Sequence, residues 1–171
     1  DPNRSNWGAS PDGILTDPTV KYPKDYQFVL ENVSDRHRGV LEIKSSRWNC
    51  KFNAYFFPQV IWEMVNAQTY WGDVVRYAEM RVMDEDTRMW TTKQECRKVR
   101  IFRHIPTEQQ MVHLVLKSLA CKKRGDKNKY MQLVHSNEFV EFRKQFETIA
   151  AQANEQYENI PIAVDAIAQL L

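Results

Sequence analysis

The sequence has no apolar run that approaches the ~20 residues a membrane-spanning helix needs. It also has no internal repeat and no low-complexity tract. Strong charge of either sign is missing too, because 24 Lys and Arg residues against 22 Asp and Glu residues give a net charge of +2. Such a balance neither requires nor excludes a nucleic acid partner, so a local basic patch is more informative than the total. We expect no membrane partner.

Cysteine is scarce as well. The three cysteines are an odd number, lie far apart and form no Cys-x-x-Cys pair, so we expect free thiols in a reducing, intracellular compartment. No spacing of cysteine and histidine resembles a zinc site, and three cysteines are too few for an iron–sulfur cluster with four cysteine ligands. The four histidines are scattered and are expected to be surface or packing residues.

Composition and pattern predict one α/β domain. With 171 residues, of which 43% are hydrophobic, the chain is long enough to bury about two-thirds of its extended surface. The expected fold is a restriction-endonuclease-like mixed central sheet, largely antiparallel at its first strands and flanked by helices. Residues 1–134 would form the core and 135–171 the C-terminal helices. Strands are predicted at 14–16, 26–33, 40–44, 74–82, 89–92 and 97–102, the first three as a meander, and helices at 58–70, 107–120, 137–157 and 162–171.

Two short acidic segments hold the strongest functional signal. Asp12 lies in a Pro-Asp-Gly turn just before a short apolar run. Glu42 and Lys44 are two residues apart in a predicted strand, so both project from one face. Leu41 and Ile43 project from the other face, which we expect to be the core face. Two carboxylates and one ammonium group would then meet near one strand edge.

These residue types suit metal-dependent cleavage of a phosphodiester. Mg²⁺ prefers oxygen ligands and keeps several waters, so one or two protein carboxylates such as Asp12 and Glu42 are enough to hold it. A bound metal lowers the pKa of water and stabilises charge on phosphate oxygens. Lys44 would orient or help deprotonate the attacking water and offset the charge that develops.

A Glu-x-Lys triplet is a weak signal by itself, because an acidic residue two positions before a basic one recurs at 79–81, 95–97 and 141–143. The ordinary explanation of an isolated copy is a solvated strand or helix face. The triplet at 42–44 differs because it lies in an apolar, β-branched run, follows Asp12 by 30 residues and precedes an amphipathic helix. The combination of the three features carries the prediction.

The helix predicted from Pro58 has a polar stripe formed by Gln59, Glu63 and Asn66 at positions i, i+4 and i+7. Gln59 lies in its first turn, where the positive end of the helix dipole favours phosphate. The alternative explanation is an amphipathic helix with a solvated face, and the sequence favours neither.

Three segments in this order resemble one known group of enzymes. Residues 8–13, residues 39–44, and residues 53–55 leading to Gln59 and Met64 are similar to the core of the phage lambda exonuclease and YqaJ-type viral recombinase family. That family belongs to the PD-(D/E)XK superfamily of nucleases. The resemblance covers roughly residues 5–120.

The resemblance implies a Mg²⁺-dependent exonuclease, with Mn²⁺ as a substitute, that digests duplex DNA from a 5′ end and leaves a 3′ single strand for recombination. By motif matching, Asp12, Glu42 and the Ile43 carbonyl would be metal ligands. Lys44 would be the catalytic lysine and Gln59 the supporting helix residue. A restriction-like or structure-specific endonuclease and a non-catalytic DNA-binding module remain alternatives.

The resemblance also implies partners. Such recombination nucleases are commonly paired with a single-strand annealing protein, and they act in the cytoplasm, or in the host nucleus if viral. The family has a helical region upstream of the Pro-Asp-Gly turn, so we expect a missing N-terminal segment or a companion chain. A homo-oligomer is a further candidate.

Candidate DNA contacts directly follow Lys44 in the sequence, and a second group lies nearer the C-terminus. Ser45 and Ser46 stand where family members often have Cys-Pro, and together with Arg47 they are candidate contacts. A second candidate is the basic segment 117–129, which holds six Lys and Arg residues against one Asp. Within it we single out Lys122, Lys123 and Arg124. The ordinary explanation of this segment is a solvated loop. Trp48, Tyr55, Phe56 and Phe57 are expected either to stack on a DNA end or to lie in the core.

Overall fold

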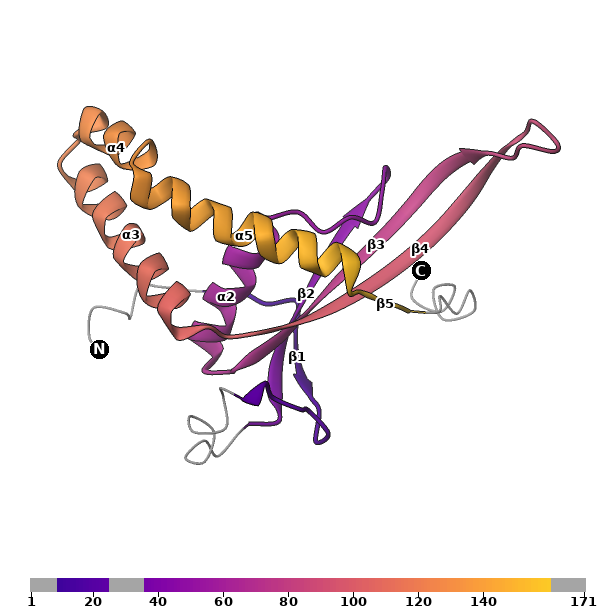
Figure 1. Ribbon diagram of the computed structural model, residues 1–171, viewed down its shortest axis with the longest axis horizontal. Coiled ribbons are helices and arrows are strands. Elements are labelled where there is room, and N and C mark those ends of the chain that lie inside the picture. Colours follow the sequence, from indigo (N-terminus) through magenta and orange to yellow (C-terminus); the bar gives the residue numbers. More distant parts are fainter. Residues whose placement is uncertain (1–8, 25–35, 161–171) are drawn as a thin grey trace.

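The computed structural model describes residues 9–24 and 36–160 of the chain (Figure 1). It has the predicted α/β architecture, in which helices pack against a mixed central sheet. The elements in chain order are β1 (Gly13–Thr16), β2 (Arg38–Ser46), α2 (Phe56–Ala67), β3 (Trp71–Met83), β4 (Trp90–Phe102), α3 (Ile105–Lys123), α4 (Lys127–Val134), α5 (Asn137–Glu155) and β5 (Glu158–Asn159).

The five strands follow the order β1-β2-β3-β4-β5. Strands β2 and β3 are parallel, and the other neighbouring pairs are antiparallel. The parallel pair arises because α2 carries the chain from the end of β2 back to the start of β3, as a crossover must. This connection places a helix directly over the strand that holds Glu42 and Lys44.

The core lies between one face of the sheet and the helices α2, α3 and α5. Val40 of β2 and Val74 of β3 are fully buried on this face because α2 covers them. Gly72 lies between the two layers, where an added Cβ would come within 2.7 Å of Val40 Cγ2 and 2.9 Å of Val60 Cγ1. The absence of a side chain at this position therefore lets α2 pack closely on the sheet. The remaining buried members of the core are Phe52, Phe57, Ile61, Met64, Met111, Leu114, Phe142, Phe146, Ala150 and Ala153.

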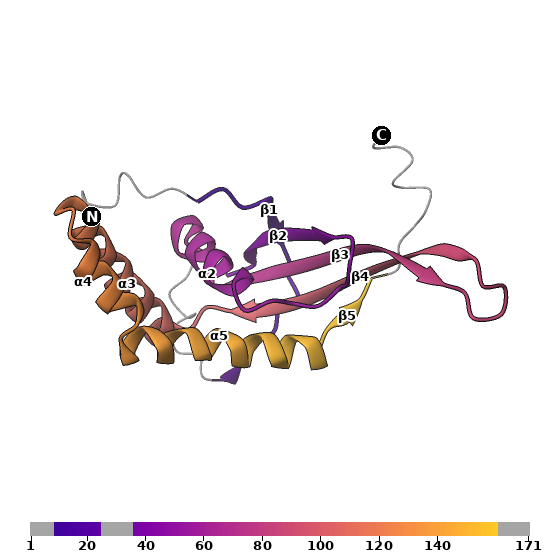
Figure 2. The same ribbon diagram turned by 90° about the horizontal axis from the view of Figure 1, so that it is seen from above.

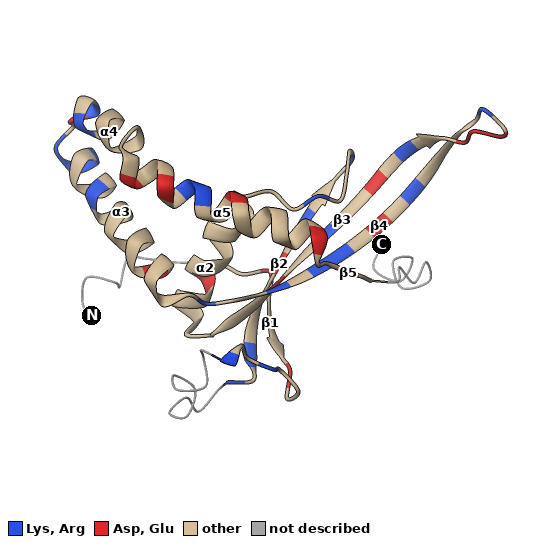
Figure 3. Ribbon diagram, viewed as in Figure 1, with Lys and Arg blue, Asp and Glu red and all other residues tan. Residues whose placement is uncertain are grey.

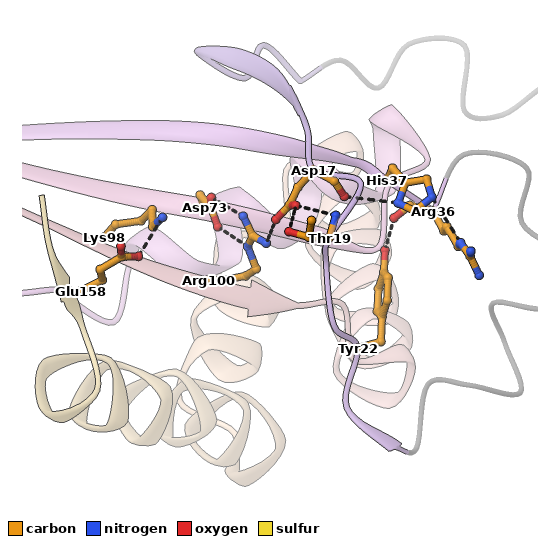
Figure 4. A network of polar contacts seen from close by, with 9 residues as sticks. All are labelled: Asp17, Thr19, Tyr22, Arg36, His37, Asp73, Lys98, Arg100 and Glu158. Carbon is orange, nitrogen blue, oxygen red and sulfur yellow. Dashed lines mark hydrogen bonds and ion pairs between the residues drawn. The ribbon is translucent and has the colours of Figure 1, made fainter.

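A polar network ties the opposite face of the sheet to the segment after β1 (Figure 4). The Arg100 guanidinium donates to both carboxylate oxygens of Asp73, at 2.7 and 2.8 Å, and to Asp17 at 2.5 Å. The hydrogen bond from Arg100, followed by those from Thr19, lowers the pKa of Asp17 to about 2. Arg100 also lies 4.0 Å from the centre of the Trp71 ring. This network fixes the position of the chain that follows β1.

Strands β3 and β4 pair along their whole length, and their distal part projects beyond the helices as an arm, here residues 79–94 (Figures 1 and 2). Asp84 shapes the turn at its tip, because its Oδ1 atom accepts hydrogen bonds from the backbone N–H groups of Asp86 and Thr87 at 3.1 and 2.8 Å. Arg88 has a positive φ of 53°, which closes the turn.

Several predicted elements differ from the structure. Helix α2 ends at Ala67 because Gln68 is left-handed, with φ 57°. The two strands predicted at 89–92 and 97–102 are one continuous strand, β4. The basic segment is not a loop: it forms the end of α3 and the start of α4, joined at Gly125 with φ 66°. The strand predicted at 26–33 and the helix predicted at 162–171 lie outside the described residues.

Two expectations from composition concern the chain as a whole. Cys50, Cys96 and Cys121 are all free, as predicted. Among the helices of residues 9–24 and 36–160, none has the length and apolar character needed to cross a membrane.

Candidate functional site

Strand β2 places Glu42 and Lys44 beneath α2. Side chains of a strand point alternately to its two faces, so those of Val40, Glu42 and Lys44 share the face that this helix covers. Only 2% of the Glu42 surface is exposed. The expectation that Leu41 and Ile43 would occupy the core face was wrong: Ile43 is 48% exposed. The crossover helix packs on the charged face, so the carboxylate is buried where a hydrophobic residue was expected.

Three of the predicted site residues form a closed hydrogen-bonded triangle. Lys44 pairs with the Glu42 carboxylate, and its Nζ atom donates to Gln59 Oε1 at 2.9 Å. Gln59 Nε2 in turn donates to Glu42 Oε1 at 2.8 Å. Gln59 is in the first turn of α2, so the helix start holds both charged side chains of β2 in place. A buried carboxylate needs such partners, because an unpaired one would be strongly destabilising.

Asp12, in the turn just before β1, lies beside this triangle, and Asp12, Glu42, Lys44 and Gln59 together are called the patch. Its Oδ2 atom accepts a hydrogen bond of 2.6 Å from the backbone N–H of Ile43. The register of the β1–β2 pair, with Gly13 opposite Leu41, brings the turn beside the middle of β2. Asp12 is exposed, whereas Glu42 is buried. One carboxylate therefore faces solvent at the edge of the patch and the other lies beneath the helix.

Glu63 lies beside the predicted site residues, although it was not among them. Glu63 follows Gln59 by one turn of α2, and Gln59 Nε2 donates to its Oε1 atom at 3.0 Å. The side chain is 2% exposed, and its Oε2 atom is buried with no hydrogen-bond partner among the described residues. Burial, opposed by the Gln59 hydrogen bond and reinforced by the Glu42 charge, raises the pKa of Glu63 to about 7. The position of Glu63 in the polar stripe of the helix could have indicated a role in the site, but its burial was not predictable from the sequence.

The donor atoms at this patch suit a hard divalent cation. The Asp12 and Glu42 carboxylates and the Ile43 carbonyl are oxygen donors of the kind that Mg²⁺ and Mn²⁺ prefer. Within residues 9–24 and 36–160 there is no cluster of three or more His, Cys, Asp or Glu side chains arranged to hold a metal ion. Two carboxylates and one carbonyl are a donor set that suits an ion which keeps several waters.

The candidate DNA contacts that follow Lys44 line the end of β2. The Ser45 carbonyl accepts a hydrogen bond from Arg76 Nη1 at 2.8 Å. Ser46 Oγ accepts one from the Trp48 backbone N–H at 3.1 Å, so its hydroxyl shapes the chain after the strand. The Ser45 and Arg47 side chains are exposed.

The structure separates the four aromatic residues near the motif. Phe56 and Phe57 are buried in the core, with exposed fractions of 3% and 0%. Trp48 is 85% exposed and Tyr55 is 71% exposed. Tyr55 is the N-cap residue that precedes α2, four positions before Gln59. Of these four aromatic residues, Trp48 and Tyr55 are thus the ones available for contact with a partner.

The other basic candidates are not part of this patch. Lys122, Lys123 and Arg124 lie at the C-terminal end of α3, a helix of 19 residues. At 1.5 Å per residue, α3 is about 28 Å long. Figure 3 shows Lys and Arg colour at the corner between α3 and α4, away from β2.

Comparison with protein-family models, with curated proteins and with solved structures gives no match.

Proposed function

We propose that the chain is a metal-dependent deoxyribonuclease that hydrolyses phosphodiester bonds of duplex DNA as an exonuclease. The observation that carries this proposal is the convergence on one patch of Asp12 from the turn before β1, Glu42 and Lys44 from β2, and Gln59 from α2. The resemblance to the lambda exonuclease and YqaJ-type family supports the same activity, with digestion from a 5′ end and a role in recombination or repair.

Each residue has a separate task in the proposed reaction. Asp12, Glu42 and the Ile43 carbonyl would hold Mg²⁺ or Mn²⁺, which supplies Lewis-acid stabilisation of the phosphate and a more acidic water. Lys44 stands on the same strand face as Glu42 and directs its ammonium group toward the scissile phosphate. There it orients the attacking water and stabilises the developing negative charge.

Gln59 acts as a positioning residue. Its amide binds Lys44 through oxygen and Glu42 through nitrogen, so neither charged side chain is free to rotate away. Catalytic groups must be held close to the productive geometry, and small displacements reduce the rate strongly. Because Gln59 belongs to the rigid start of α2, the helix itself sets this geometry.

Exposed aromatic side chains beside the patch suit a DNA end. Trp48 and Tyr55 present flat apolar surfaces to solvent. Bases that are no longer paired stack on such rings without sequence preference. Ser45, Ser46 and Arg47 would contact the phosphates of the same strand. The remaining partner proposed is a single-strand annealing protein.

The test compares a linear duplex with a covalently closed circle of the same sequence, in Mg²⁺ and in EDTA. The proposal predicts that the linear duplex is digested in Mg²⁺, that the circle stays intact and that EDTA stops the reaction. Cleavage of the circle would replace the exonuclease with an endonuclease that uses the same residues.

A non-catalytic DNA-binding module is the second candidate, and one observation favours it. The Glu42 carboxylate is buried and already engaged by Lys44 and Gln59, as in a purely structural ion pair. Tight duplex binding with no cleavage in Mg²⁺ or Mn²⁺, even after an upstream or companion chain is added, would favour this candidate.

A further inference from the structure

The tip of the arm combines exposed apolar side chains with acidic ones. Met83 and Trp90 are paired across the hairpin and are 52% and 65% exposed, and the neighbouring Met89 is 65% exposed. The loop between them contains Asp84, Glu85 and Asp86 against the single basic residue Arg88. An exposed cluster of large apolar residues with a charged rim is typical of an interaction site.

This tip has a defined conformation. Besides the hydrogen bonds that Asp84 Oδ1 accepts, the Asp84 backbone N–H donates to the Met89 carbonyl and the Arg88 N–H donates to the Asp84 carbonyl, both at 2.9 Å. The Thr87 hydroxyl donates to Asp84 Oδ1 at 2.9 Å. An ordered tip loses little conformational entropy when it binds, which favours its use as a docking element.

The complementary surface is at the other end of the molecule. Helices α3, α4 and α5 enclose an open cavity of about 570 Å³ at the corner where α3 meets α4. Its lining is mainly apolar and includes Met111, Leu114, Leu119, Tyr130 and Phe142. A cavity of this kind suits a large apolar side chain from a partner.

The rim of the cavity is basic. Lys122 and Lys127 line it, and Lys123, Arg124 and Lys129 lie on the same corner, against one acidic residue, Asp126. All five basic side chains are exposed, and none forms an ion pair with any residue that the structure describes. Asp126 caps α4 by accepting a hydrogen bond from the Lys129 backbone N–H at 2.9 Å. The corner therefore presents an apolar cavity within a positive field.

We propose that the arm tip of one copy of this chain docks into the α3–α4 cavity of a second copy. Trp90 and Met89 would fill the apolar cavity, while Glu85 and Asp86 would face Lys122 and Lys127 on its rim. The two surfaces are complementary in both respects, because each combines a large apolar element with charge of opposite sign. Opposed charges of this kind steer the encounter and fix the register of the contact.

A second copy explains the cavity better than DNA does. A duplex would neutralise the basic rim, but its phosphate backbone offers nothing to fill an apolar cavity. The acidic loop at the arm tip also repels DNA, so the tip needs a positively charged protein surface. DNA binding at the corner is retained as an outcome of the test.

The contact joins unlike surfaces. The arm tip and the α3–α4 corner lie at opposite ends of the longest axis, so a molecule cannot satisfy its own cavity (Figures 1 and 2). Each copy that docks its arm still has a free cavity, and the next copy is added in the same way. Such a head-to-tail contact produces a closed ring if the rotation closes and a filament if it does not.

The experiment is sedimentation velocity of the chain without DNA over a range of micromolar concentrations. The proposal predicts concentration-dependent association that weakens at high salt, because charges on the rim are screened. Trp90→Ala removes the proposed anchor, and Lys122→Glu with Lys127→Glu reverses the rim charge. Each variant is expected to weaken association by about tenfold or more, as loss of a central interface residue does.

The matched control is Lys21→Glu with Lys51→Glu, which makes the same change of charge at exposed sites outside the three helices that enclose the cavity. This control should associate like the parent chain. Circular dichroism and thermal unfolding check that every variant is folded, as expected for exposed substitutions.

Mixing the two defective variants gives the most selective result. The Trp90→Ala chain keeps an intact cavity and the rim variant keeps an intact tip, so only one native contact is possible between them. An equimolar mixture should form a one-to-one pair with the affinity of the parent contact and nothing larger, at concentrations where each variant alone associates about tenfold or more weakly than the parent chain.

Three results would overturn the proposal. The first is a parent chain that stays monomeric throughout the concentration range. The second is a pair of variants that both associate as strongly as the parent chain. The third is that the rim variant loses duplex binding, measured by fluorescence anisotropy, while self-association is unchanged. That last result would assign the corner to DNA.

Discussion

The carboxylate of Asp12 accepts a 2.6 Å hydrogen bond from the backbone N–H of Ile43, 31 residues further along the chain. This contact fixes the turn before β1 against the middle of β2. Because neighbouring positions of β2 carry a carboxylate and an ammonium group, it brings the two acidic segments of the sequence into one patch. The proposed chemistry depends on that arrangement.

Lys44→Ala should reduce digestion of a linear duplex by about 100-fold or more, because the variant lacks the cation that orients water and stabilises developing charge. Removal of the ion-pair partner of the buried Glu42 carboxylate should lower stability, but Gln59 still donates a hydrogen bond to that carboxylate, so the fold should persist, and thermal unfolding checks this. The measurement is the initial rate of digestion of an end-labelled duplex in Mg²⁺. Lys98→Ala is the matched control: Lys98 is in the same sheet but pairs with Glu158, and its loss should leave the rate unchanged. Equal rates in the two variants would remove Lys44 from the mechanism.

Glu63 should make stability depend on pH. Its pKa in the folded chain is raised from 4.5 to about 7, so between these values the folded state keeps a proton that the unfolded state has released. The stabilisation is complete below about pH 4.5 and is lost as the pH rises through about 7. Urea unfolding in EDTA at about pH 5 and about pH 8 measures the loss.

Glu63→Gln provides the comparison, because its amide is neutral at every pH and nearly the same size. The free energy of unfolding of this variant should fall less between the two pH values than that of the parent chain. An identical fall in both proteins would show that Glu63 ionises freely in the folded chain.

Trp48→Ala should weaken binding of a duplex with a frayed or single-stranded end. A base stacked on an aromatic ring contributes about 1–3 kcal/mol, so the dissociation constant should rise by about 5-fold to 160-fold. Because Trp48 is 85% exposed, stability should not change. Anisotropy of a labelled oligonucleotide in Ca²⁺ or EDTA measures binding without cleavage. Trp48→Tyr keeps a stacking ring and should restore most of the affinity; if it binds no better than the alanine variant, stacking is not the cause.

Gly72→Ala should move α2 away from the sheet. The added methyl group would meet Val40 and Val60 at less than 3 Å, and such overpacking costs about 1–3 kcal/mol. Gln59 moves with the helix, so the rate of digestion should fall as well. Gly13→Ala is the control for stability, because its Cβ would lie 3.5 Å from Leu41, an ordinary contact. If the Gly72→Ala chain is as stable as the parent chain, then α2 and the sheet accommodate the added methyl group without strain.

Local rules were sufficient to predict most of the patch. The two-residue spacing of Glu42 and Lys44 and the position of Gln59 in the first helical turn follow from the periods of a strand and a helix. They correctly place these side chains where they meet. The mixed sheet was also predictable from the alternation of strand and helix patterns.

What the sequence did not reveal depends on contacts between distant segments. The burial of Glu42 and Glu63 follows from the packing of α2 over β2, and strand alternation alone could not show which face that helix covers. The same is true of Ile43, whose apolar side chain was expected in the core. Helix α4 was missed because its basic residues are as common in loops as in helices, and the length of the arm depends on pairing between β3 and β4.

The location of a bound divalent ion decides whether Asp12 and Glu42 hold the catalytic metal. Crystals soaked in Mn²⁺ give an anomalous signal that identifies the ion and its ligands. We expect a peak in contact with the carboxylates of Asp12 and Glu42, and we expect this peak to disappear in an Asp12→Asn variant. A peak elsewhere, or none at this patch at saturating Mn²⁺, would contradict it.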